Sequence, residues 1–177
     1  MGYAVPGTVI AVGVLIPFAW LDNRVDALAM AWFDTSTGLL LSGTLAALLF
    51  AYVVRFLSVS LQSVESGLAR IRPALDESAR TLGASGFNTL RRVHLPILRG
   101  SLLTALLLVF VDVLKELPAT LILRPFNVNT LAVRTYELAS DERLVDAATP
   151  ALAIVLIGLL PVILLVRALL AGETDRG

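Results

Sequence analysis

Cysteine is absent from the 177 residues of this chain, and histidine occurs once, as His94. Without cysteine the chain can hold no disulfide, thiolate metal site or cysteine nucleophile. One histidine leaves little scope for a histidine-based centre, so we expect no metal site. Charge is also scarce, since 16% of the residues are Asp, Glu, Lys or Arg and the net charge is zero. Soluble domains average about 25% charged residues, and a neutral chain is not expected to bind nucleic acid.

Apolar residues make up 57% of the chain, and the mean hydropathy is +0.84. A water-soluble fold could not bury this much apolar surface, so the lipid bilayer must cover part of it. About 20 helical residues cross a hydrocarbon core of roughly 30 Å, and in lipid each segment has to satisfy its own backbone polar groups. We predict an all-α integral membrane protein with spans at residues 3–21, 38–57, 100–123 and 147–170.

The segments between these spans differ in charge. Residues 55–99 hold seven arginines against three acidic residues, whereas residues 22–34 and 124–146 carry more acidic than basic residues. The positive-inside rule therefore places the arginine-rich segment in the cytoplasm. Both termini are then cytoplasmic, and the other two loops face outward.

A spaced motif lies within the arginine-rich segment. Apolar residues from Leu61 to Leu75 recur at helical spacing, and Pro73 should kink or restart that helix. The chain then reads Glu77-Ser78-Ala79, three residues, Gly83, nine residues and Val93-His94-Leu95-Pro96.

Each part of the motif suits contact with another protein. Small side chains around Gly83 would allow close backbone approach, and Glu77 offers a charge for a basic partner. We expect Pro96 to end the loop helix and redirect the chain into the next span, and His94 to be a loop residue. The alternative for this segment is an amphipathic helix that lies on the membrane surface.

This spacing resembles the cytoplasmic loop of bacterial ABC importer permeases, which reads Glu-Ala-Ala, three residues, Gly, nine residues, Ile-x-Leu-Pro. Ser78 departs from the pattern at the first alanine, and Val93 replaces isoleucine. The resemblance implies a type I (MetI-like) permease helix bundle of the bacterial inner membrane, incomplete at four spans. Residues 61–98 would couple it to a separate ATPase subunit. The implied coupling residues are Glu77, Ser78, Ala79, Gly83, Val93, Leu95 and Pro96.

Chemistry within the chain itself is not expected. The sequence has no Gly-x-x-x-x-Gly-Lys-Ser/Thr segment, so a P-loop nucleotide site is absent. We also find no nucleophile–base pair or metal-ligand set in the spans, which an intramembrane enzyme would need. We therefore expect no catalytic residue and no cofactor, and a transport subunit rather than an enzyme.

Charges interrupt the third span at Asp112, Lys115 and Glu116, and Pro118 follows at once. Charges at this depth are costly and usually face a protein interior or a water cavity. The spacings i, i+3 and i, i+4 place all three near one face, and Pro118 should bend or break the helix. Two interpretations stand: a structural Asp112–Lys115 pair, or a translocation path. Arg124 beyond the break could steer a solute or be a surface charge.

Several runs are similar to the permeases of ferric-iron ABC importers. They are Tyr3-Ala4-Val5-Pro6-Gly7-Thr8, Lys115-Glu116-Leu117-Pro118-Ala119-Thr120, Arg124-Pro125-Phe126 and residues 136–143. The resemblance covers essentially the whole chain, as the C-terminal portion of such a permease. It implies ferric iron delivered by a periplasmic binding protein, and a second permease copy or half. Met1-Gly2 leads into the first span without signal features, so we expect part of a longer permease.

Other readings remain open at this point. The solute could be thiosulfate, sulfate or a polyamine, and the chain could be a truncated fragment that does not transport. Residues 130–146 read as a short amphipathic outer helix. This helix would either help to receive the binding protein or pack across the outer end of the bundle.

Overall fold

The computed structural model describes residues 5–174, with the side chains of 165 and 168–174 excepted. Within this range the chain is helical and has no strand, which confirms the all-α prediction. The elements in chain order are α1 (Gly7–Phe33), α2 (Leu45–Leu68), α3 (Pro73–Thr81), α4 (Gly86–Thr89), the π-helical turn η2 (Leu90–His94), α5 (Leu95–Leu114), α6 (Pro118–Leu123), α7 (Leu131–Ser140) and α8 (Leu144–Thr174).

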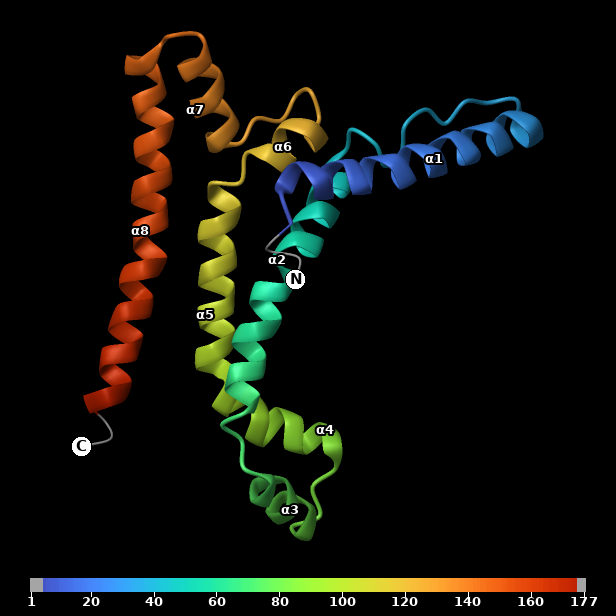
Figure 1. Cartoon of the computed structure of the whole chain (residues 1–177). Coiled ribbons are helices and arrows are strands. Elements are labelled where there is room, and N and C mark those ends of the chain that lie inside the picture. The colour runs from blue at the N-terminus through green and yellow to red at the C-terminus, as the bar shows by residue number, and fades with distance from the viewer. Residues whose placement is uncertain (1–4, 175–177) are drawn as a thin grey trace.

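Four helical stretches in the described chain are long and apolar enough to cross a membrane, as predicted. They are Gly7–Phe33, Leu45–Leu68, Gly86–Leu114 and Leu144–Leu164. Figure 1 shows α2, α5 and α8 running side by side, with α3 and α4 at one end of them. At the other end, α1 lies across α2 and α6 rather than parallel to the other three long helices.

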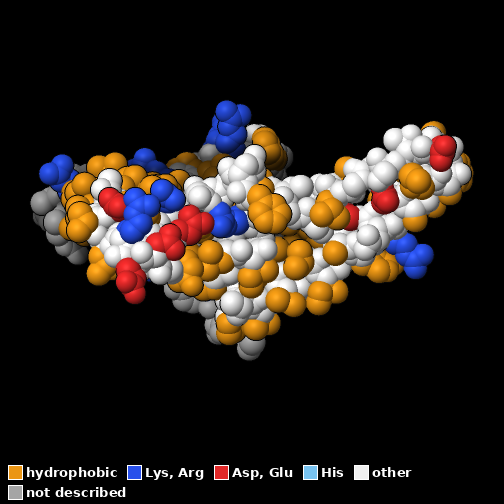
Figure 2. Space-filling view, turned by 90° about the horizontal axis from the view of Figure 1, so that it is seen from above, with side chains coloured by type: hydrophobic (Ala, Val, Ile, Leu, Met, Phe, Trp, Pro, Cys, Tyr) orange, Lys and Arg blue, Asp and Glu red, His pale blue; other side chains and the backbone are white. Residues whose placement is uncertain are grey.

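A small apolar core fixes that crossing. Where α1, α2 and α6 meet, the buried side chains are Ile10, Ala11, Val14, Ala47, Leu48, Ala51, Ala119 and Leu123. The rest of α1 projects away from the bundle and exposes large apolar side chains, as do the outer faces of α2, α5 and α8. Figure 2 shows hydrophobic side chains along the projecting helix with a few charged ones between them, while a larger group of charged side chains lies at the opposite side of this view. This surface suits a chain that lipid covers.

The first predicted span was too short, because α1 continues through residues 22–33 where a loop was expected. Asp22 is 1% exposed and accepts hydrogen bonds from the backbone N–H groups of Leu40, Leu41 and Ser42 at 3.2, 2.9 and 2.8 Å. Asp26 accepts from the backbone of residues 37 and 38 in the same way. The following loop thus satisfies both carboxylates, so their charge does not end the helix.

The second span begins and ends later than predicted, at Leu45 and Leu68. Residues 38–44 are irregular, with Gly38 and Gly43 in the left-handed region at φ 62° and 69°. Arg55 falls near the end of the predicted span 38–57 and was also counted with the arginine-rich segment; the structure places it in the middle of α2. A charge with a partner can lie within a span.

The third span was misplaced at both ends. Pro96 does not end a loop helix, because one continuous helical stretch runs from Gly86 to Leu114. Proline clashes with the carbonyl four residues earlier in an α-helix, and the π turn before Pro96 shifts that register by one residue, with Leu95 N–H donating to Leu90 O. At the far end, the break expected at Pro118 is confirmed, since α5 stops at Leu114 and α6 starts at Pro118.

The last two predicted helices are present with shifted bounds. The outer helix expected within 130–146 is α7, which ends at Ser140 and packs on α8. The fourth span, expected at residues 147–170, belongs to α8, which already starts at Leu144.

Gly67 allows α2 and α5 to approach closely at the end near α3. A Cβ atom there would lie 2.5 Å from Ser101 Oγ and 2.8 Å from Leu98 Cδ2. We predict that Gly67→Ala lowers stability by about 1–3 kcal/mol through overpacking. Thermal unfolding in detergent measures this effect. Gly13→Ala is the matched control, because no atom lies within 4 Å of the Cβ position; an equal loss in both variants would contradict the packing argument.

Candidate functional site

The predicted coupling segment, residues 61–98, contains two short helices, α3 and α4, whose connection includes a left-handed glycine. Pro73 occupies the first turn of α3, where its missing N–H costs nothing. At the other end, Gly83 N–H donates to Arg80 O and Ala84 N–H to Ala79 O, both at 2.9 Å, which is a Schellman motif. Gly83 has φ 76°, and no atom lies within 4 Å of its Cβ position. Its role within the chain is therefore conformational, and the close approach to another protein that the sequence suggests stays a prediction.

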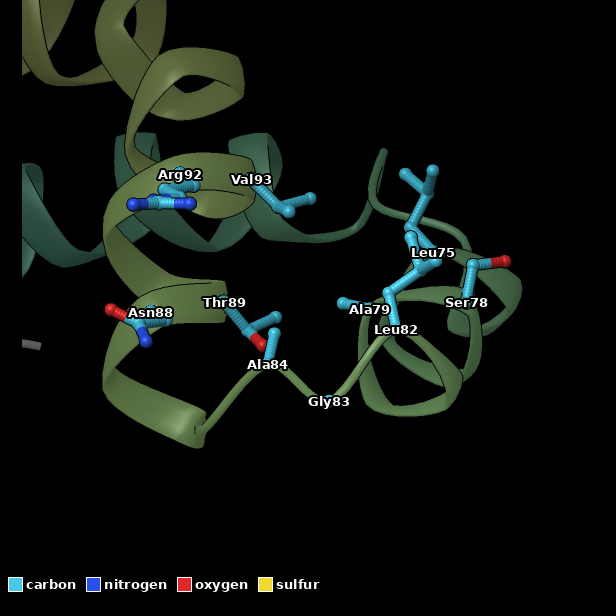
Figure 3. Close-up of a pocket in the computed structure, with 10 residues that line it drawn as sticks. All are labelled: Leu75, Ser78, Ala79, Leu82, Gly83, Ala84, Asn88, Thr89, Arg92 and Val93. Carbon is cyan, nitrogen blue, oxygen red and sulfur yellow. The ribbon is translucent and has the colours of Figure 1, made fainter.

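An open groove of about 450 Å³ separates α3 from α4 and η2 (Figure 3). In Figure 3 the connection through Gly83 and Ala84 joins the two sides of the groove. Four of the predicted coupling residues line it, namely Ser78, Ala79, Gly83 and Val93. Glu77, Leu95 and Pro96 are not part of its lining and are exposed.

Two large apolar side chains stand out beside this groove. Leu82 is 87% exposed and Phe87 is 71% exposed, in a segment that also carries several arginines. Glu77 makes no ion pair within the described chain. The segment thus presents apolar, acidic and basic groups that the chain itself leaves available to a partner.

A second polar site lies where α5 breaks. A pocket of about 260 Å³ is lined by Arg55, Phe56, Asp112, Lys115, Glu116 and Pro118. Lys115 Nζ lies 3.0 Å from Asp112 Oδ1, so the predicted pair is confirmed. Its two members differ in exposure, since the Lys115 side chain is 63% exposed and that of Asp112 is 15% exposed.

Glu116 is the most deeply buried of these charges, with 6% of its side chain exposed. Its Oε2 lies 3.0 Å from Arg55 Nε, an ion pair without hydrogen-bond geometry. Its Oε1 accepts from the Ala119 N–H at 3.2 Å, which satisfies a backbone donor at the start of α6. Arg55 Nη1 in turn donates to Val5 O at 3.2 Å.

These contacts join three parts of the chain around one ion pair. A Cβ atom at Gly7 would meet Glu116 Oε1 at 2.7 Å and Arg55 Nη1 at 2.8 Å, so a side chain at the start of α1 would displace these two charged groups. Tyr52 and Thr120 add a hydroxyl–hydroxyl bond of 2.5 Å between α2 and α6. Sequence reasoning missed Arg55; the signal was a lone arginine between apolar runs on both sides.

Arg124 is not part of this pocket. Its guanidinium lies 2.8 Å from Glu137 Oε1 on α7 and also donates to Asn129. It therefore ties the segment after α6 to α7. Tyr3 and Ala4 of the run at the chain start lie outside the described residues.

Metal ligands do not gather in the part of the chain that the structure describes. No group of three or more Asp, Glu or His side chains there is placed to hold a metal ion.

Comparison with known proteins identifies the family. Residues 1–172 match the family described as binding-protein-dependent transport system inner membrane component. The chain belongs to this family. It is accordingly a multi-pass protein of the inner membrane, with the helical fold of an ABC importer permease.

Relatives of this permease chain carry different solutes in their names. The Fe(3+)-transport system permease protein FbpB 2 of Haemophilus influenzae is 28% identical over 145 residues, 82% of this chain and 29% of the relative. The putative 2-aminoethylphosphonate transport system permease protein PhnV of Salmonella typhimurium is 30% identical over 157 residues, 89% of this chain and 53% of the relative. The chain thus spans between about a third and a half of these permeases.

The Arg55–Glu116 pair gives the sharpest prediction for the permease bundle. Arg55→Ala leaves a buried carboxylate without its partner, and we expect a loss of about 3–5 kcal/mol in the free energy of unfolding. Arg55→Met with Glu116→Gln removes both charges and should recover most of it. Chemical denaturation in detergent measures the free energy of unfolding of the unchanged protein, of Arg55→Ala and of the double variant. Lys115→Ala, at a mainly exposed side chain, is the control; a loss as large as that of Arg55→Ala would contradict the argument.

Proposed function

We propose that this chain is the transmembrane permease part of an ATP-driven solute importer, and that residues 61–98 receive the push of a separate ABC ATPase. One observation carries the proposal. Of the motif residues, Glu77 is exposed on the short helix α3, and Gly83 is the left-handed glycine that ends this helix. Leu95 and Pro96 begin α5. A force that the ATPase exerts on α3 can therefore reach the helical stretch Gly86–Leu114 through the turn at residues 82–85.

The chemistry of the segment supports an ATPase as the partner. Exposed Leu82 and Phe87 offer apolar anchors at the end of the bundle where α3 and α4 lie, and such side chains mark interaction sites when they are not covered by lipid. Exposed Glu77 can pair with a basic residue of the ATPase. This chain has no P-loop, so the nucleotide is bound elsewhere.

The polar pocket is our candidate for a wall of the solute path. Asp112, Lys115, Glu116 and Pro118 meet there at a helix break, which is how membrane helices commonly build a cavity lining. The remaining walls would come from a second permease copy or half. Arg124 belongs to the outer segment, where a periplasmic binding protein would dock.

Ferric iron is the solute that we propose, on the likeness to ferric-transport permeases. A phosphonate with an amino group is the second candidate, on the likeness to PhnV and because Asp112 and Lys115 present a carboxylate and an ammonium group in one pocket. Vesicles that hold the complete importer should take up labelled ferric iron when ATP is inside. Uptake of labelled 2-aminoethylphosphonate instead would overturn the iron assignment and keep the permease.

The motif glycine tests coupling. Gly83→Leu places a side chain on a backbone at φ 76°, a strain of roughly 1–2 kcal/mol for an L-residue. We expect weaker co-purification with the ATPase and slower uptake, at normal membrane insertion. Gly100→Leu is the control, since nothing lies within 4 Å of its Cβ position and it is outside the motif. Unchanged uptake by Gly83→Leu would refute the assignment.

Topology follows from charge, and it is testable because the chain has no cysteine. Six arginines lie in residues 70–99, so this segment should be cytoplasmic and residues 124–143 should face outward. If all four long helices cross the membrane, both termini are cytoplasmic. The side of the N-terminus depends on whether α1 crosses, because α1 lies across the other helices.

Two single-cysteine variants check this orientation. A membrane-impermeant maleimide added to intact cells should label Asn127→Cys and should label Ser85→Cys only after the membrane is opened. Both residues are exposed, so access differs by side and not by burial. External labelling of Ser85→Cys would end the coupling proposal.

A further inference from the structure

Asp76 and His94 close the coupling segment into a ring. Asp76 Oδ1 lies 2.6 Å from His94 Nε2. Asp76 is in the first turn of α3, and His94 is the last residue of η2, directly before α5. At their opposite ends the two sides are joined by residues 82–85, with the groove between them. The chain thus holds α3 to the membrane helix at both ends of the groove.

The pair matters because little else restrains α3. All nine residues of α3 are described, and Ala79 is the one that is buried. Short non-helical connections, residues 69–72 and 82–85, flank the helix, and the second contains Gly83 with no atom near its Cβ position. Without the bridge, α3 could turn about these connections with little loss of apolar contact.

His94 also lies at the junction of η2 and α5, within the helical stretch that leads to the polar pocket. The π turn that it completes adds a residue to the helix, and such turns frequently occur at functional sites. Asp112 of the polar pocket lies 17 residues after Leu95 on the same helix, roughly 26 Å along its axis. A contact at His94 therefore acts on the near end of the helix whose far end lines that pocket.

We propose that Asp76 and His94 are positioning residues that make α3 and α5 move as one body, so that displacement of α3 by the ATPase reaches the polar pocket. The inference rests on the proposed coupling function. The bridge does not depend on one charge state of the imidazole. A neutral ring donates its Nε2–H to the carboxylate, and a protonated ring adds an ion pair.

The first test measures coupling in vesicles that hold the complete importer. Asp76→Ala or His94→Ala should leave ATPase association and ATP hydrolysis within about twofold while solute uptake per ATP falls about tenfold, the effect of losing one charge-assisted hydrogen bond. The double variant should be no worse than either single one, since both remove the same contact. The exchange Asp76→His with His94→Asp should restore part of the uptake. Asp34→Asn, at an exposed carboxylate outside residues 61–98, is the control.

The second test measures the effect of the Asp76–His94 contact in the permease without the ATPase. Spin labels on Thr81→Cys and Gly100→Cys report the distance between α3 and α5 in the permease, and no native cysteine interferes. We expect a narrow distribution that broadens in Asp76→Ala and in His94→Ala. An unchanged distribution, or equal losses of hydrolysis and uptake, would overturn the inference. Broadening in a permease that shows no ATP-driven uptake would support the contact and refute the proposed function.

Discussion

Hydrocarbon offers no partner to a backbone amide or a charge, and the charges of Asp22, Arg55 and Glu116, in or beside the long apolar helices, each meet a partner from the chain itself. The break between α5 and α6 shows how this works. Glu116 accepts from the Ala119 N–H at the start of α6 and faces Arg55 from the middle of α2. One carboxylate thereby accepts a hydrogen bond at the start of α6 and pairs with the arginine. Gly7 has no side chain, which leaves space for both charged groups.

The same constraint shapes the opposite end of α1 and the connection to α2. Asp22 lies within α1 and accepts three backbone hydrogen bonds from residues 40–42. These bonds satisfy donors of an irregular loop that would otherwise lack partners beside apolar surface. Asp22 and Arg55 are therefore structural anchors within the long helices, and the polar pocket includes Arg55 and Glu116, which this anchoring already requires.

The segment from α3 to η2, which we propose to be cytoplasmic, is held differently, because water would satisfy its backbone on that side of the membrane. Its helices are short, α3 buries one residue, and its shape comes from the Schellman turn at Gly83 and the Asp76–His94 bridge. Exposed apolar side chains such as Leu82 and Phe87 then remain for a partner. A loosely packed segment held by few contacts can be displaced as a unit. At the pocket, by contrast, the Arg55–Glu116 pair connects the residue before α1, the middle of α2 and the start of α6.

The sequence by itself determined the helical class, the four apolar stretches, the break at Pro118 and the motif of the coupling segment. These features depend on composition and on local spacing, which a single segment carries. Tertiary structure decided where the helices end, because Asp22 and Arg55 are tolerated within them through partners 18 or more residues away. It also decided that Arg124 turns to Glu137 rather than to the pocket, and that His94 meets Asp76. Partners so distant in sequence come together only when the helices pack, so local patterns could not reveal them.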